Sequence, residues 1–168
     1  MVYPNTYDSF RVVSSGDLVI PSDHNDLAAA VKAIETRLGI LPPFIRRVYN
    51  TTTDSTPTEL FLDGSSLRIS VPANTLIGFT AYITGYCSAT GERIFILISG
   101  AISRDGSDNT TLVGSPIITE VSADSSVSGV WTANAVADDV NEALVIEVIG
   151  EISKTITWVC HITWTQNP

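Results

Sequence analysis

Few side chains in this 168-residue chain have the type and spacing that catalysis or metal binding requires. His24 and His161 are the two histidines, and neither is accompanied by a nucleophile motif such as G-x-S-x-G. Cys87 and Cys160 lack C-x-x-C spacing, and Cys160 should point to the opposite face of a strand from His161. We therefore expect no catalytic residues, no metal site and no cofactor.

Two acidic clusters, at 105–109 and 138–139, contain oxygen ligands of the kind that calcium prefers. The first matches no complete calcium-loop signature, and turn formation is the favoured interpretation. The chain also has no glycine-rich phosphate loop between a strand and a helix. A chain this poor in histidine, lysine and ordered acid pairs is predicted not to be an enzyme.

The charge and hydropathy of the chain argue against two classes of partner. Nine Lys and Arg stand against eighteen Asp and Glu, and the net charge of −9 opposes a phosphate backbone, so we expect no nucleic acid partner. No apolar segment approaches the ~20 residues needed to cross a bilayer, so we expect no membrane partner. The first residues lack the features of a secretory signal, and we expect synthesis in a cytosol.

Residues 21–41 have the helical pattern of the chain. Their apolar residues are spaced four and three apart in alternation, which is the narrow seam of a coiled coil. Ser22 or Asp23 can cap the start of the helix and Gly39 can end it. A helix of this length is marginal alone in water, so it must pack against sister helices, its own head or a larger assembly. The predicted oligomer seam consists of Leu27, Val31, Ile34, Leu38 and Leu41.

The segments around this helix complete a three-part organisation. Residues 1–20 have the pattern of an extended arm, and true disorder is depleted in aromatic residues, so we interpret Tyr3, Tyr7 and Phe10 as residues that dock on another surface. A pair of prolines then forms a stiff hinge at 42–43. We predict an extended attachment arm over 1–20, a helical oligomerisation stem with its hinge over 21–43, and a β-rich head over 44–168.

The remainder of the chain is predicted to be mainly β. Charged residues make up 16% of the chain against a usual ~25%, and hydroxyl-bearing and branched residues are abundant. Short apolar runs alternate with turn residues, which is typical of an antiparallel β-sandwich or jelly roll. The predicted strands are 44–50, 59–62, 67–71, 76–87, 93–102, 111–121, 127–132, 143–150 and 155–165.

The last of these strands has the clearest pattern, because apolar residues occupy every second position. This alternation predicts that one face lies in the core and that the other, with His161, points outwards. The predicted core residues of this strand are Ile156, Trp158, Cys160, Ile162 and Trp164.

The segment 3–39 resembles the opening of many small tailed-bacteriophage structural proteins, in which an arm of the form YP..-DSF leads into a helix of the form HNDL..A..AIE..LG. The head resembles the terminal β-domains of phage fibre and appendage proteins through ISVPANTL, TLVGS and EVIGEISKTITWV. The residues that match the first pattern are Tyr3, Pro4, Asp8, Ser9, Phe10, His24, Asn25, Asp26, Leu27, Ala30, Ala33, Ile34, Glu35, Leu38 and Gly39.

This resemblance implies a virion component, typically a homotrimer, that is assembled in the host cytoplasm. Its partners would be other virion proteins of the capsid, neck or tail. We predict a non-enzymatic structural protein, a short trimeric fibre or capsid decoration protein, anchored to the particle by its N-terminus through Tyr3, Tyr7 and Phe10.

The alternative is a carbohydrate-binding adhesin or the receptor-binding tip of a tail fibre. A sugar site needs aromatic platforms beside polar groups, and the candidates for contact with a host surface glycan are Tyr82, Tyr86 and Trp131. Packing in the core or in a subunit interface is the other interpretation of these three residues.

Overall fold

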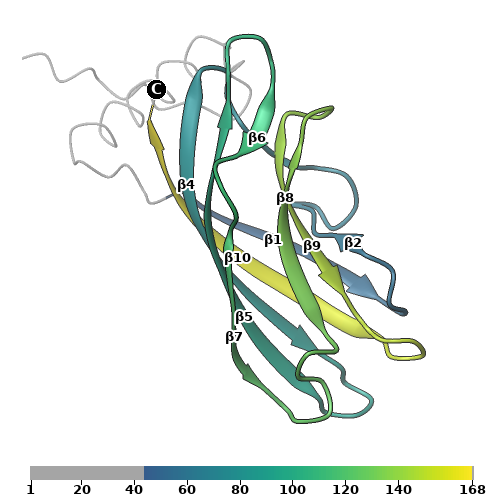
Figure 1. Cartoon of the computed structure of the whole chain (residues 1–168). Helices are drawn as coiled ribbons and strands as arrows, with labels where there is room; N and C mark the ends of the chain where they lie inside the picture. Colours follow the sequence, from purple (N-terminus) through teal and green to yellow (C-terminus); the bar gives the residue numbers. More distant parts are fainter. Residues whose placement is uncertain (1–43, 168) are drawn as a thin grey trace, which may run out of the picture. The chain divides into compact units, whose positions relative to one another are not determined.

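The structure is a computed structural model that describes residues 44–167. The predicted arm and stem, with the seam residues and the attachment residues, lie outside the described residues. No helix able to cross a bilayer occurs between 44 and 167. The elements of this region are β1 (Phe44–Thr52), β2 (Thr58–Glu59), β3 (Ile69–Ser70), β4 (Thr75–Tyr86), β5 (Arg93–Arg104), β6 (Thr110–Leu112), β7 (Ile117–Ala123), β8 (Thr132–Asp138), β9 (Ala143–Ile149) and β10 (Ile156–Asn167) (Figure 1).

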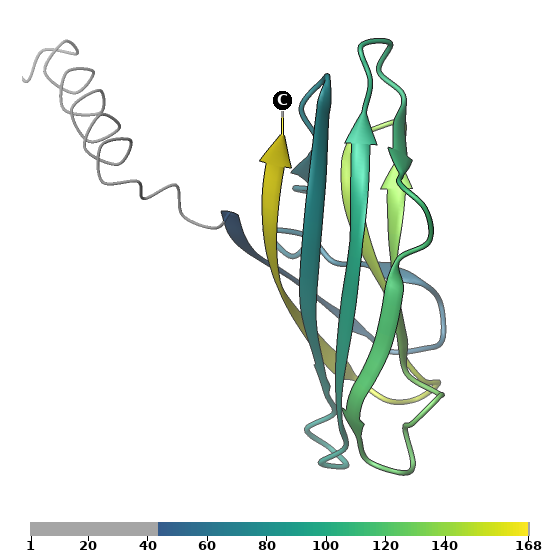
Figure 2. The same cartoon turned by 60° about the vertical axis from the view of Figure 1, so that its left-hand side comes forward.

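These strands form two antiparallel sheets. The six-stranded sheet has the order β1-β10-β4-β5-β6, and β7 also pairs with β5. The four-stranded sheet has the order β2-β9-β3, and β8 pairs with β9. Figure 2 shows β10, β4 and β5 running side by side as the long central strands of the larger sheet. The prediction of a mainly β, antiparallel domain is confirmed.

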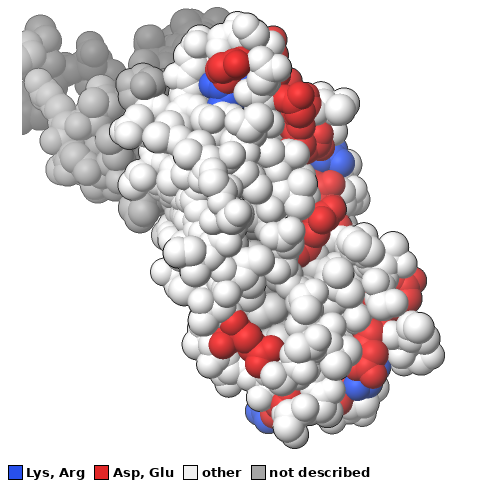
Figure 3. Space-filling model, viewed as in Figure 1, with Lys and Arg blue, Asp and Glu red and all other residues white. Residues whose placement is uncertain are grey.

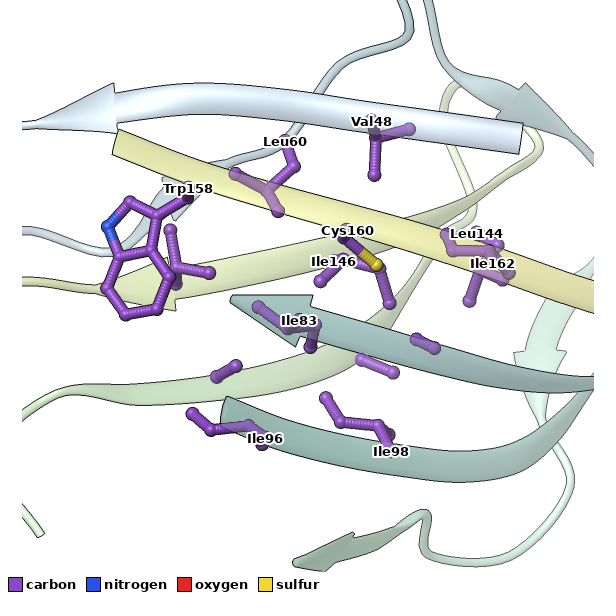
Figure 4. Close-up of a cluster of buried hydrophobic side chains, with 14 of the residues drawn as sticks. Val48, Leu60, Ile83, Ile96, Ile98, Leu144, Ile146, Trp158, Cys160 and Ile162 are labelled. Carbon is purple, nitrogen blue, oxygen red and sulfur yellow. The ribbon is translucent and has the colours of Figure 1, made fainter. Parts of the chain in front are cut away.

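Both sheets contribute side chains to one hydrophobic core. The long strands alternate buried and more exposed residues, because successive side chains of a strand point to opposite faces. Figure 4 shows part of this core, with Val48, Ile83, Ile96, Ile98, Trp158, Cys160 and Ile162 from the six-stranded sheet and Leu144 and Ile146 from β9.

The predicted facing of the last strand is confirmed over most of its length. The inward residues of β10 from Ile156 to Ile162 are buried, and His161 is exposed. Trp164 is half-buried and packs against the core. Both cysteines are free and buried, as a small hydrophobic residue would be.

The predicted strand at 111–121 is divided into β6 and β7. Gly114 lies between them with a φ of +75°, a left-handed conformation that favours glycine. Pro116 follows and has no backbone N–H to donate to a ladder. β6 therefore pairs with the end of β5, the chain turns away at Gly114, and β7 then pairs with an earlier part of β5.

The predicted strand at 127–132 is wrong. Its apolar residues lie in a turn, in which the N–H of Trp131 donates to the carbonyl of Val127 at 3.0 Å. The strand that the sequence did not predict, β8, follows immediately. Alanine has a weak preference for strands, but Ala133 and Ala135 are buried against the core, and this burial overrides the local preference.

Candidate functional site

The outer face of the six-stranded sheet carries two exposed tyrosines. In β4 the inward residues Phe79 and Ile83 are buried, and the alternate residues point outwards. Tyr82 and Tyr86 belong to this outward series and are 45% and 48% exposed. Their separation in sequence corresponds to about 13 Å along a strand. The strand therefore presents two aromatic rings on one surface.

The neighbours of these tyrosines come from β5 and β10. Tyr82 pairs with Leu97 on one side and with His161 on the other. Tyr86 pairs with Arg93 at the start of β5. Each ring therefore stands beside at least one polar side chain, which is the combination that a sugar site requires.

A hollow of about 610 Å³ opens on this face, at the ends of β4 and β7 and the start of β5. Tyr86 and Phe95 contribute aromatic carbon, and Arg93 and Asp124 contribute charged groups. We call it the Tyr86 hollow. It is lined by Thr84, Gly85, Tyr86, Arg93, Ile94, Phe95, Ser122, Ala123 and Asp124.

Arg93 and Asp124 are fixed to each other by backbone contacts. The N–H of Arg93 donates to Oδ2 of Asp124 at 2.8 Å, and the N–H of Asp124 donates to the carbonyl of Arg93 at 3.0 Å. The guanidinium Nε lies 3.4 Å from the same Oδ2, and the two side chains are 73% and 39% exposed. Among the described residues, the Nη groups of Arg93 and Oδ1 of Asp124 have no hydrogen-bond partner. One carboxylate oxygen and two donor groups of residues that line the hollow therefore have no partner in the described part of the chain.

A polar cluster ties together the loops beside the hollow. Nζ of Lys154 lies 2.8 Å from Oε2 of Glu92 and 2.9 Å from Oε2 of Glu151. The hydroxyl of Ser126 donates to Glu92 at 2.7 Å, and the indole N–H of Trp131 donates to Glu151 at 3.1 Å. These bonds connect the β4–β5, β7–β8 and β9–β10 loops.

Hydrogen bonding controls the protonation of this cluster. Lys154, together with two hydroxyl groups, lowers the pKa of Glu92 from 4.5 to about 2. Lys154 also lowers the pKa of Glu151, and the two carboxylates raise the pKa of Lys154. Both carboxylates are therefore ionised at neutral pH and hold no proton to donate. We assign the cluster a structural role.

The prediction that Trp131 contacts a receptor is wrong, because this residue is 1% exposed. Its ring packs edge-on against Trp158, with ring centroids 5.9 Å apart and an interplanar angle of 62°. Its indole N–H is used by Glu151. Tyr82 and Tyr86 are accessible, and their role as receptor contacts stays a prediction.

The acidic clusters at 105–109 and 138–139 stabilise their own turns, and the second cluster also bonds to other elements, because Asp139 accepts the backbone N–H of Thr110. Oδ1 of Asp105 accepts the backbone N–H of Ser107 at 2.8 Å and that of Asn109 at 3.0 Å. Oδ1 of Asp138 accepts the backbone N–H of Asn141 at 3.0 Å. Within the described strands and loops, no group of three or more His, Cys, Asp and Glu side chains is placed to hold a metal ion.

The charged side chains are unevenly distributed over the surface. Figure 3 shows one side of the domain, on which the acidic residues gather in separate groups with a broad area free of charged side chains beside them. A surface of this kind can contact an uncharged partner without first removing water from charged groups.

Tyr86 is the one residue of the Tyr86 hollow that was singled out in the sequence, and the residues that were missed include Arg93, Phe95 and Asp124. Arg93 and Asp124 are 31 positions apart and meet only because β7 returns to pair with β5. The predicted single strand over 111–121 concealed this pairing. The turn residues Gly114 and Pro116 were the signal that could have revealed it.

No family model matches this chain, and no curated protein matches it. Solved structures that are similar in part include two phage tailspike proteins. The tailspike protein gp49 from Acinetobacter baumannii bacteriophage Fri1, described as a capsular polysaccharide depolymerase, is 16% identical with a TM-score of 0.34, and the match covers 79% of this chain and 23% of that chain. The tailspike protein of Acinetobacter phage vB_ApiP_P1 is 9% identical with a TM-score of 0.34, and the match covers 72% of this chain and 22% of that chain.

The prediction that the chain is not an enzyme is contradicted by the first of these descriptions, because a depolymerase is an enzyme. The chain spans less than a quarter of the length of either tailspike, and a TM-score of 0.34 is too low to transfer an activity or a substrate.

Proposed function

We propose that this chain is a bacteriophage virion protein whose β-domain binds a carbohydrate of the host surface through the outer face of the six-stranded sheet. The observation that carries the proposal is the Tyr86 hollow, in which an exposed aromatic ring lies beside donor and acceptor groups that have no partner between residues 44 and 167. Small-molecule sites combine apolar surface with a few polar groups in this way.

The virion assignment is supported by the resemblance of residues 3–39 to the opening of small phage structural proteins. In this proposal the arm over 1–20 attaches to capsid, neck or tail proteins, and the stem over 21–43 forms a homotrimer. Residues 44–168 then form the displayed head. We propose that this head is a β-sandwich, because both sheets contribute to one core.

One observation favours a second candidate function, a fibre or decoration subunit whose head contacts neighbouring virion proteins. The edge strand β7 exposes three large apolar side chains, Ile117, Ile118 and Val121. It carries one charged residue, Glu120, whose carboxylate accepts hydrogen bonds from Ser128 and Gly129. An apolar edge strand of this kind can be covered by pairing with another protein.

Labelling and adsorption experiments together test the two candidates. An antibody against residues 44–168 should label one kind of appendage on intact particles in negative-stain images. Excess purified full-length protein should slow adsorption of those particles to host cells if the head binds the host surface. Labelling without competition would favour the decoration role, and unlabelled particles would contradict a virion component of either kind.

A further inference from the structure

We infer that the Tyr86 hollow binds a neutral sugar unit, with Tyr86 against the apolar face of the ring and with Arg93 and Asp124 bonded to neighbouring hydroxyl groups. This inference rests on the proposed binding of a host carbohydrate. It adds the roles of the residues in the hollow and the charge class of the ligand.

The aromatic part of the hollow suits a pyranose. One face of a sugar ring presents mainly C–H groups, and the flat amphipathic ring of a tyrosine can pack against such a surface while its hydroxyl stays in water. Tyr86 is exposed at the end of β4, and the half-buried Phe95 adds further aromatic surface on the neighbouring strand. A sugar in the hollow would therefore cover carbon that water now contacts.

The polar part of the hollow matches a pair of neighbouring hydroxyl groups. A sugar hydroxyl both donates and accepts hydrogen bonds, so a pair of them is best met by a donor and an acceptor side by side. The Nη groups of Arg93 are donors and Oδ1 of Asp124 is an acceptor, and these groups are unpaired among the described residues. Ser122 lines the same hollow.

The charges of the hollow favour a neutral ligand over an acidic one. Arg93 is the one cationic residue among those that line the hollow, and it is accompanied by Asp124. The charge of the lining is therefore balanced, and the net charge of −9 over the chain repels polyanions. A polysaccharide rich in uronate or phosphate would find the positive charge of Arg93 already neutralised by Asp124.

The two polar residues are held in place before a ligand arrives. Each donates a backbone N–H to the other. Arg93 directly follows Glu92, and Asp124 is two residues before Ser126, whose hydroxyl donates to Glu92 in the polar cluster around Lys154. Lys154 links Glu92 to the β9–β10 loop. Such preorganisation lowers the entropic cost of binding.

The test uses the full-length protein and a printed panel of bacterial polysaccharides, one set neutral and one set containing uronate or phosphate. We expect binding within the neutral set. The strongest neutral ligand is then titrated by calorimetry against Tyr86→Ala, Arg93→Met and Asp124→Asn. Each variant should bind the ligand at least about tenfold more weakly, because the loss of a stacked ring or of a charged hydrogen bond raises the dissociation constant by about that factor.

The control variant is Ile152→Ala, which removes an exposed apolar side chain from the β9–β10 turn and should bind as the unchanged protein does. Asp124→Asn keeps an oxygen for the N–H of Arg93, and thermal melts of all variants identify any that fail to fold. Binding to the acidic set alone, binding to neither set, or full affinity in folded Tyr86→Ala would overturn the inference. If Tyr86→Ala loses glycan binding but still blocks adsorption as well as the unchanged protein, the hollow is a sugar site and the proposed function fails instead.

Discussion

The indole N–H of Trp158 donates a hydrogen bond of 2.9 Å to the hydroxyl oxygen of Thr52, and both side chains are buried. The bond joins the ends of β1 and β10 inside the core. A buried indole N–H without an acceptor would destabilise the fold. Because Thr52 supplies this acceptor, Trp158 can fill the space between the sheets. The same ring packs against Trp131.

The first prediction concerns this pair. Thr52→Val keeps the shape of the side chain but leaves the indole N–H without an acceptor, which should lower the free energy of unfolding by about 1–3 kcal/mol. Trp158→Ala should cost about 3–5 kcal/mol, because it removes burial and leaves a cavity. The exposed control His161→Ala should stay within about 0.5 kcal/mol. Urea denaturation measures all three, and equal effects of the two β10 substitutions would contradict the facing of this strand.

The second prediction compares the same substitution at two glycines of β4. A Cβ on Gly85 would lie 2.7 Å from Cζ3 of Trp158 and 2.9 Å from Cγ2 of Ile94, so Gly85→Ala should destabilise the domain by about 1–3 kcal/mol. A Cβ on Gly78 would meet Oγ1 of Thr165 at 3.5 Å, an ordinary contact. Gly78→Ala should be neutral or should stabilise by up to about 1 kcal/mol, since it restricts the unfolded chain. Thermal melts that rank the two variants in the opposite order would show that Gly85 does not face Trp158.

Much of the β-architecture follows from local sequence patterns. Strict alternation placed the inward residues of β10 correctly, because one face of this strand meets an apolar core and the other meets water. Alternation failed for β8, where Ala133 and Ala135 are buried although alanine gives little strand signal. The apolar residues from Val127 to Trp131 predicted a strand where the structure has a turn, because a turn can also bury apolar residues.

The sequence allowed the aromatic residues of the candidate site to be predicted, but not the polar residues beside them. Tyr82 and Tyr86 could be selected because they are aromatic and share one face of a strand. Their polar neighbours could not, because the contact of Arg93 with Asp124 depends on a strand pairing that joins distant parts of the chain. Such pairings are set by the packing of the whole domain, and a local pattern does not reveal them.

The third prediction concerns acid stability. The pKa of Glu92 falls from 4.5 to about 2 on folding, mainly through its hydrogen bond to Lys154. A lowered carboxyl pKa adds stability that is fully present above pH 4.5 and is lost as the pH falls through about 2. Urea midpoints should therefore drop over this interval, and Glu92→Gln should show a smaller drop and a lower midpoint at pH 7. A variant whose midpoint depends on pH as steeply as that of the unchanged protein would show that Glu92 is not stabilised in this way.

The fourth prediction concerns the stem. Burial of Leu27, Val31, Ile34 and Leu38 between copies would contribute about 1.5–3 kcal/mol for each side chain. Sedimentation should show a trimer of the full-length protein at micromolar concentration, and the double substitution Val31→Asp with Ile34→Asp should release monomers. Residues 44–168 alone should be monomeric and melt cooperatively. A monomeric full-length protein would exclude the predicted seam.

The last prediction concerns attachment to the particle. An extended arm with spaced aromatic residues can lay them into grooves of another subunit, at an entropic cost that is met when the arm becomes ordered there. Deleting residues 1–20 should leave a soluble trimer that no longer co-sediments with particles lacking this protein, and replacing Tyr3, Tyr7 and Phe10 together by Ala should have the same effect. The Tyr86→Ala variant is the matched control, because it changes an aromatic residue of the head and should bind particles normally. If the truncated protein decorates particles as well as the full chain, the head carries attachment, and the exposed edge of β7 becomes the surface through which it binds.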